Sequence, residues 1–209
     1  GLEIIRLESA LSEGSKLQEL NFSNCKLGEI GGKILALGLS KNSWLQSLIL
    51  VNNDLGDSIA AGIIHAVTHN HSLRQLDLSQ NKLASESAKA LQDLIKKNPN
   101  VEKYNLHLNK INEKEGYLLQ EALYFNSKIV QFNIHHNPVK YNTIETVERI
   151  VKDNQKKLRF HAVPKLKTEV AKKRVFIQDE KHNVSQAIEM EKAKAEVNYS
   201  MRIHQLTLS

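Results

Sequence analysis

The sequence predicts an α/β solenoid, in which short strands and helices alternate along a stack of repeats. The first reason is that one pattern of apolar residues returns every 28 residues, without insertion, between Leu17 and Asn154. The second is that the two halves of each unit have different periodicities. Apolar residues alternate in the first half, as in a strand, and are spaced by three or four in the second half, as in a helix.

The first half of each unit predicts a short strand. In the third copy, Leu76 and Leu78 face one side of this strand and Asp77 faces the other. The strand is followed, at the same position in every copy, by an asparagine or a cysteine. This first asparagine column consists of Cys25, Asn53, Asn81, Asn109 and Asn137.

The five copies share the spacing L-x-x-L-x-L-x-x-N/C-x-L, which resembles the leucine-rich repeat family and covers about two thirds of the chain. The length of the unit is similar to the ribonuclease-inhibitor-like subtype. The resemblance implies a curved parallel sheet on the concave side and helices on the convex side. It also implies that the first asparagine column bonds the turns into a ladder, in which Cys25 is buried and behaves as a small hydrophobe.

The second half of each unit predicts a helix, because small or apolar residues recur at i, i+3 and i+7. The five triplets are Gly32/Leu35/Leu39, Ala60/Ile63/Val67, Ala88/Leu91/Ile95, Gly116/Leu119/Leu123 and Ile144/Val147/Val151. A second asparagine column ends the helices, at Asn42, Asn70, Asn98, Asn126 and Asn154. We expect left-handed backbone there, since asparagine tolerates it after a helix.

The two ends of the chain depart from the repeat. Residues 1–16 keep its register, with Ile4, Leu7 and Leu11 in the helix columns, so we expect the helix of a truncated preceding repeat in a fragment of a longer protein. After five repeats over residues 17–154, we expect residues 155–164 to close the array, with an irregular strand at 158–163 before Pro164.

Residues 165–209 predict a charged helical extension, helical from about 165 to 197. Val163, Val170, Ile177 and Val184 recur every seven residues, and the repeat then fails at Glu191. This segment either docks on the end of the array or pairs with a helix or filament of a partner.

Composition limits the classes of function. The chain carries a formal net charge of +6. It has one cysteine, which favours a reducing, intracellular compartment such as the cytoplasm, the cytoskeleton or a cilium. No long apolar run predicts a membrane span. The basic excess lies in the extension, where aromatic residues are few, so nucleic acid is a minor alternative.

Catalysis is not expected. His65 and His69 have the spacing of two metal ligands on a helix, but no third ligand accompanies them. No nucleophile–base pair or phosphate-binding loop is recognisable. We therefore predict neither an enzyme nor a cofactor or metal site.

Two surfaces are candidates for binding other proteins. On the concave face, His107 and His135 should be neighbours at roughly 5 Å on adjacent strands, with His136 nearby. They belong either to a solvated polar strip or to a pH-sensitive or acidic-partner contact near the C-terminal end of the arc. The concave candidates are Ile49, Val51, Arg74, Asp77, Asn105, His107, Asn133 and His135. The candidates in the extension are Lys165, Lys167, Lys172, Lys173, Arg174, Ile177 and Val184.

These features predict a non-catalytic protein–protein interaction scaffold. Arrays with charged helical extensions resemble structural subunits of cytoskeletal and ciliary or axonemal assemblies, including the actin-capping tropomodulins. Two alternatives remain: a regulator of a small GTPase or other enzyme through the concave face, and the recognition array of an innate sensor.

Overall fold

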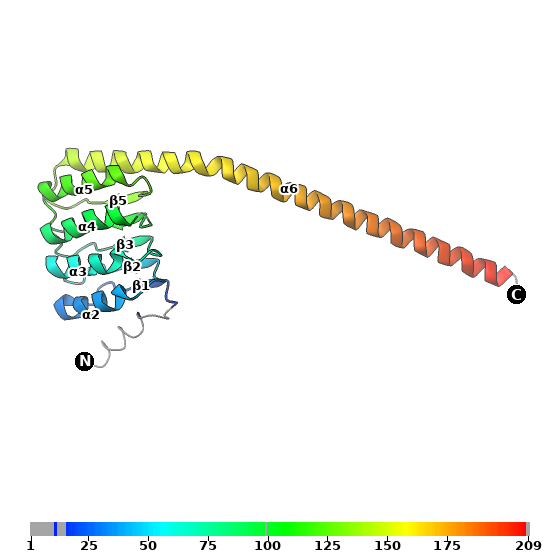
Figure 1. Ribbon diagram of the computed structural model, residues 1–209, viewed down its shortest axis with the longest axis horizontal. Helices are drawn as coiled ribbons and strands as arrows, with labels where there is room; N and C mark the ends of the chain where they lie inside the picture. The colour runs from blue at the N-terminus through cyan, green and yellow to red at the C-terminus, as the bar shows by residue number, and fades with distance from the viewer. Residues whose placement is uncertain (1–10, 12–15, 99, 208–209) are drawn as a thin grey trace. The chain divides into compact units, whose positions relative to one another are not determined.

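The computed structural model describes residues 11, 16–98 and 100–207; beyond residue 160 it describes the side chains of 168–174, 176–178, 180–181, 184–185, 188–191 and 194. The chain forms two compact units, Gly1–Leu158 and Arg159–Ser209. Figure 1 labels the helices and strands along the chain.

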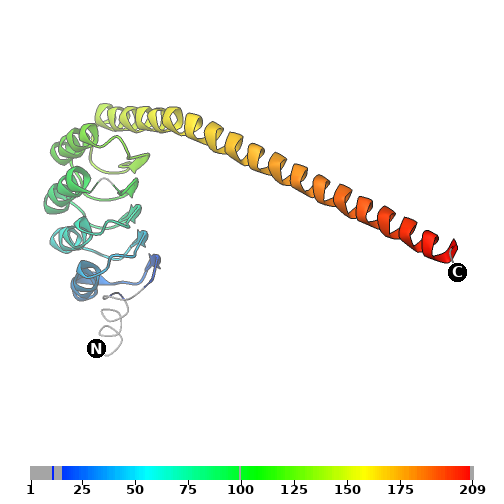
Figure 2. The same cartoon turned by 45° about the vertical axis from the view of Figure 1, so that its right-hand side comes forward.

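The first unit is a stack of strand–helix repeats. Its strands are β1 (Glu19–Asn21), β2 (Ser47–Ile49), β3 (Gln75–Asp77), β4 (Lys103–Asn105) and β5 (Gln131–Asn133). Its helices are α2 (Gly28–Ser40), α3 (Asp57–Thr68), α4 (Ser85–Lys97), α5 (Glu113–Phe125) and the start of α6 (Tyr141–Thr207). The strands form one parallel sheet in chain order, and Figure 2 shows them on the opposite side of the unit from the helices.

The hydrophobic core lies between the sheet and the helices. Paired residues in neighbouring strands are 28 positions apart. The central pairs, such as Leu20↔Leu48 and Leu76↔Tyr104, have buried side chains. The predicted helix triplets also face the core, although Ile144 is only half-buried. The period of 28 residues therefore predicts the strand register correctly.

The first asparagine column forms the expected ladder. Asn53 Oδ1 accepts the backbone N–H of Cys25 at 3.1 Å, and its Nδ2 donates to the carbonyl of Phe22 at 2.7 Å. Asn81 and Asn137 bond the preceding turn in the same way. Each side chain thus joins its own turn to the turn of the repeat before it.

Cys25 was expected to be buried, but it is exposed. It lies in the turn after β1, the edge strand of the sheet, so no earlier strand of the described chain covers it. Leu11 is helical and buried, as its register predicts; Ile4 and Leu7 lie outside the described residues.

The second asparagine column has a different role from the one expected. Asn98 and Asn126 have φ of −112° and −126°, so neither is left-handed. Their side chains instead bond across repeats: Asn98 Nδ2 donates to the carbonyl of Asn70 at 2.8 Å, and Asn126 Nδ2 donates to that of Ile95 at 3.0 Å. This is a second ladder, at the other end of the strands.

The closing strand expected at 158–163 is absent, because these residues belong to helix α6, which continues through Pro164 to Thr207. A strand there would pair with β5 through the carbonyl of Val130, but that carbonyl accepts a hydrogen bond from the Gln155 side chain. The helix expected at 165–197 is part of α6.

Candidate functional site

The open face of the sheet carries polar side chains that fold back onto the strand ends. Asp77 Oδ1 accepts the backbone N–H of Ser79 at 2.9 Å and its hydroxyl at 2.6 Å. Asn21 accepts from Ser23 in the same way, at 3.0 Å and 2.7 Å. These bonds hold the side chains in place and leave them less free than solvated polar groups.

Hydrogen bonds also cross from strand to strand on this face. Asn105 Nδ2 donates to Asp77 Oδ2 at 2.9 Å and to Ser79 Oγ at 3.3 Å. Asn105 and Asn133 accept the backbone N–H of His107 and His135, respectively. The sheet face from β3 to β5 is therefore a pre-organised polar surface.

Ile49 and Val51 interrupt the polar surface at the second repeat. Both side chains are half-buried on the open face, between the Asn21–Ser23 and Asp77–Ser79 pairs of the neighbouring strands. Apolar groups at these positions cannot reach the core on the other side of the sheet. They form a small apolar patch with polar neighbours.

His107 and His135 occupy neighbouring backbone positions, since the N–H of Leu108 donates to the carbonyl of His135, but their rings contact other residues. The ring of His107 lies 4.6 Å from that of His136, edge to face, whereas His135 Nε2 lies 2.9 Å from Glu148 Oε1 of α6. Sequence reasoning missed Glu148, because nothing in the repeat pattern brings a helix residue to the strand end. His135 therefore links the sheet face to the last helix of the array.

Arg74 is exposed, and one nitrogen of its guanidinium bonds the turn before β3. Its Nη1 donates to the carbonyls of His71 at 3.0 Å and Leu73 at 3.2 Å. A longer contact of 3.5 Å reaches the carbonyl of Asn100 in the next repeat. The guanidinium thus stabilises the turn before β3.

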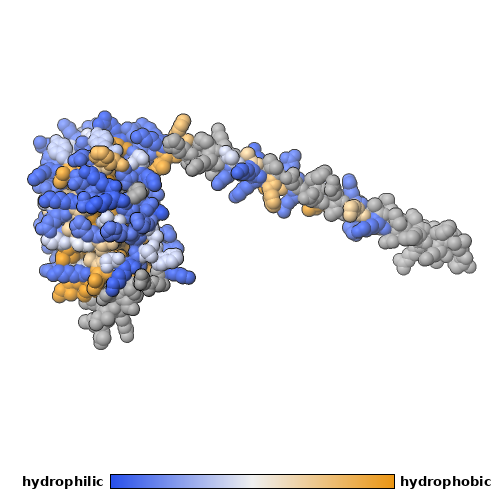
Figure 3. Space-filling model, viewed as in Figure 1, coloured by the Kyte–Doolittle hydropathy of each residue, from blue (hydrophilic) through white to orange (hydrophobic). Residues whose placement is uncertain are grey.

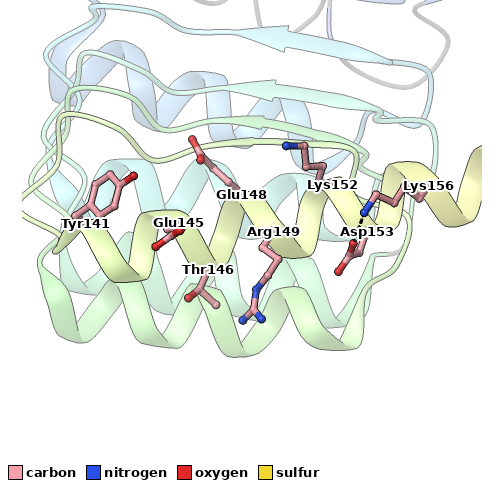
Figure 4. Close-up of a pocket in the computed structure, with 8 residues that line it drawn as sticks. All are labelled: Tyr141, Glu145, Thr146, Glu148, Arg149, Lys152, Asp153 and Lys156. Carbon is pink, nitrogen blue, oxygen red and sulfur yellow. Dashed lines mark hydrogen bonds and ion pairs between the residues drawn. The ribbon is translucent and has the colours of Figure 1, made fainter.

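Among the hollows beside α6 in the first unit are two that the sequence did not predict. The larger, of about 600 Å3, is lined by α6 residues alone (Figure 4): Tyr141, Glu145, Thr146, Glu148, Arg149, Lys152, Asp153 and Lys156. The smaller, of about 340 Å3, lies between α6 and β5, beside Phe132 and Val151. The larger hollow has equal numbers of acidic and basic side chains, so it does not select a ligand by net charge.

The second unit is the C-terminal part of α6. The residues exposed there include Lys172, Lys173, Arg174, Ile177 and Val184. Figure 3 shows hydrophobic residues between hydrophilic ones along this helix. The side chains of Lys165 and Lys167 lie outside the described set.

The described residues include no group of three or more His, Cys, Asp or Glu side chains that could hold a metal ion. None of the helices in the described part of the chain has an apolar stretch long enough to cross a membrane.

Comparisons with known proteins agree with the repeat pattern. The family described as "Leucine Rich repeat" matches residues 41–63 and 69–91, and "Leucine Rich Repeat" matches residues 16–41. No curated protein matches the chain.

Solved structures with the same fold include "Leiomodin-1 Actin-Binding Site 2 (ABS2)", with 15% identity and a TM-score of 0.62 over 79% of this chain and 94% of that one. The Caenorhabditis elegans tropomodulin C-terminal domain matches with 12% identity and a TM-score of 0.45, over 78% of this chain and 99% of that one.

Proposed function

Since this chain is a leucine-rich repeat protein, we propose that it is a non-catalytic scaffold that binds other proteins through its open sheet face and its C-terminal helix. The observation that carries this proposal is the position of Ile49 and Val51, half-exposed on the face of the sheet that has no core to cover it. Protein interfaces commonly combine such an apolar centre with a polar rim.

The polar rim supports the same proposal. Asp77, Asn105 and Ser79 are fixed by hydrogen bonds before any partner arrives, so binding would cost little side-chain entropy there. His107, Asn133 and His135 would extend this surface towards β5. Arg74 contributes by holding its turn.

The C-terminal helix would provide a second surface. Lys172, Lys173 and Arg174 form an exposed basic cluster suited to an acidic partner, next to the exposed apolar side chains of Ile177 and Val184. Lys165 and Lys167 precede this cluster in the sequence.

The setting that we propose is a large cytoskeletal or ciliary assembly, in the cytoplasm, the cytoskeleton or a cilium. The leiomodin-1 structure is described as an actin-binding site, and its likeness to this chain is one of fold. An actin or other filament protein is therefore the first partner to test. Nucleic acid is not part of the proposal, because the C-terminal helix has few exposed aromatic rings that could stack on bases.

The test is capture of partners from a ciliated cell lysate, identified by mass spectrometry. Three versions of the 209-residue chain are compared: the natural chain, a sheet-face variant (Ile49→Lys with Val51→Lys) and a helix variant (Ile177→Glu with Val184→Glu). A variant with Lys89→Glu on the exposed face of α4 is the control, and circular dichroism checks that each variant is folded.

Loss of cytoskeletal or ciliary proteins with either variant, and not with the control, would support the scaffold. A single globular partner, such as a small GTPase, lost only with the sheet-face variant would favour the alternative of an enzyme regulator. If both variants retain every partner of the natural chain, neither surface is a binding site and the proposal fails.

A further inference from the structure

Four branched apolar side chains share one face of α6 in the second unit. Val170, Ile177 and Val184 follow one another every seven residues, and Ile188 comes one turn later. Because each residue of a helix turns by about 100°, these four positions lie within about 40° of one another. Their exposed fractions are 43%, 52%, 58% and 51%, so the apolar stripe is open to solvent.

The sequence of the second unit does not favour a long helix in isolation. β-branched residues lose side-chain freedom in a helix, and Pro164 removes one backbone hydrogen bond. Most helices in proteins are stabilised by packing one apolar face against a neighbour. An exposed stripe of Val and Ile along the second unit therefore indicates a helix that is stabilised when a partner covers it.

The charges next to the stripe restrict that partner. Arg174 and Lys181 come four residues after Val170 and Ile177, respectively, so they lie at one edge of the stripe. Lys173 lies at the opposite edge, about 60° around the helix from Val170. All three are exposed. Glu191 and Glu180 are the nearest acidic residues, about 40° and 60° from the centre of the stripe on the flank of Lys173, and Glu191 is paired with Lys194.

We propose that this stripe pairs with an amphipathic helix of another protein, in which acidic residues border a narrow apolar seam. The proposal rests on the function proposed above and specifies the partner of the C-terminal helix. Val170, Ile177 and Val184 have the spacing of one of the two core columns of a coiled-coil seam. Acidic residues on the partner would face Arg174, Lys181 and Lys173.

A second copy of the chain fits this stripe less well. With Val170, Ile177 and Val184 at the a positions, the d positions that follow them are Lys173, Glu180 and Ala187. In a parallel pair of identical helices, Lys173 would face Lys173 and Glu180 would face Glu180, which is unfavourable. A different helix can place an opposite charge at each position.

A membrane surface is also less suited. Helices that lie on membranes have a broad apolar face with large side chains such as Trp, Phe and Leu. The stripe is narrow, and the charged side chains of Arg174 and Lys181 border it on one edge. Phe176 lies about 100° from the centre of the stripe.

The test measures binding of a labelled synthetic helix, about three heptads long, to the whole 209-residue chain by fluorescence anisotropy. The peptide has Ile at a, Glu opposite Lys173, Lys opposite Glu180 and Glu at g, where it faces Arg174 and Lys181. A second peptide has these charges reversed. Anionic phosphatidylserine vesicles and sedimentation of the chain alone test a membrane and a second copy.

We expect the acidic peptide to bind and the reversed peptide to bind at least about tenfold more weakly. Ile177→Glu with Val184→Glu should weaken binding of the acidic peptide at least about tenfold. Phe176→Glu with Met190→Glu, which makes the same charge change at exposed apolar residues off the stripe, should alter it less than about twofold. Circular dichroism checks the helix content of both variants.

Equal weakening by the two double variants would overturn the inference, as would binding to vesicles without binding to the peptide. Self-association that the stripe variant abolishes would replace the partner helix by a second copy. If Ile177→Glu with Val184→Glu loses cellular partners but the acidic peptide does not bind, the scaffold function stands. The inference that the partner is a helix bordered by acidic residues is then wrong.

Discussion

Gln155 Nε2 donates to the carbonyl of Val130 at 2.6 Å, and this bond ends the sheet. The equivalent carbonyls of Gln18, Gln46, Arg74 and Glu102 each accept backbone N–H groups from the following strand. At β5 no strand of the described chain follows, and a side chain from α6 takes the place of the backbone donor. The last helix therefore closes the array where a further strand was expected.

Gln155→Leu should lower the free energy of unfolding by about 1 kcal/mol, because it leaves the Val130 carbonyl without its donor while keeping similar bulk. Urea unfolding measures the effect, and hydrogen exchange should show faster opening at β5. Lys157→Leu, an exposed site on the same helix, is the control. Equal effects of the two changes would mean that the bond does not stabilise the edge.

Asn98 tests the second asparagine ladder. Its buried side chain donates to the carbonyls of Asn70 and Thr68 and accepts the N–H of Asn100. Asn98→Ala should cost about 2–4 kcal/mol of unfolding free energy, because buried backbone groups lose their partners. Asn142→Ala, at an exposed helix position, should change little.

Asn98→Gly distinguishes a hydrogen-bonded ladder between repeats from a left-handed helix end as the reason for asparagine in this column. A ladder requires the amide group, so glycine should destabilise at least as much as alanine in thermal and urea unfolding. A left-handed helix end would instead tolerate glycine, which adopts that conformation at no steric cost. Rescue by glycine would contradict the ladder.

The period of the sequence predicts the strands, helices and register because burial repeats with it: Leu48 and Leu76 occupy the same place in successive copies. It also places both asparagine columns correctly. It does not reveal what the second column bonds, since a helix end and a contact between repeats both select asparagine. The choice depends on the neighbouring repeat, as for Asn98 and Asn70.

The candidate site is predicted less completely, because it depends on contacts that break the period. The patch of Ile49 and Val51 follows from strand alternation alone. The contact of His135 with Glu148 joins a strand to the helix that follows it, and the ring contact of His107 involves His136 in a turn. No residue pattern within one repeat encodes either contact.

Gly32 is predicted to resist substitution because helix α2 lies close to Ile59. A Cβ atom at Gly32 would lie 2.2 Å from Ile59 Cγ2, whereas one at Gly62 would meet nothing within 4 Å. Gly32→Ala should cost about 1–3 kcal/mol in urea unfolding, and Gly62→Ala should gain about 0.5–1 kcal/mol. Ile59→Ala should make Gly32→Ala less costly; additive effects would contradict the clash.

Tyr104 should be replaceable by phenylalanine without loss. Its side chain is buried beside Phe132, with 5.5 Å between ring centroids, and its hydroxyl has no hydrogen-bond partner in the part of the chain that the structure describes. Burial raises the pKa of this hydroxyl well above its usual range. Tyr104→Phe should raise the free energy of unfolding by about 1 kcal/mol, because the variant buries no unpaired hydroxyl.

The exposed Tyr124 gives the control for this change, and Tyr124→Phe should leave the thermal unfolding midpoint nearly unchanged. A less stable Tyr104→Phe protein would mean that the hydroxyl is hydrogen-bonded in solution, for instance to a buried water molecule.

Asp57 should make the stability of the array depend on pH in acid. Its carboxylate caps helix α4 of the next repeat, accepting the N–H groups of Ala84, Glu86 and Ser87 and the Ser87 hydroxyl. Burial raises the pKa of Asp57, but the hydrogen bonds from Ser87, Glu86 and Ala84 together lower it below its ordinary value of 3.8.

Because the pKa of Asp57 is lower in the folded chain, the unfolded chain binds the proton more readily. The contribution of Asp57 to stability is thus complete above its unfolded pKa and is lost as the pH falls through its folded pKa. Asp57→Asn should be less stable than the natural chain near neutral pH, and urea unfolding from about pH 6 to about pH 3 should show the difference shrinking. A difference that stays constant over this range would mean that the carboxylate charge does not stabilise the cap.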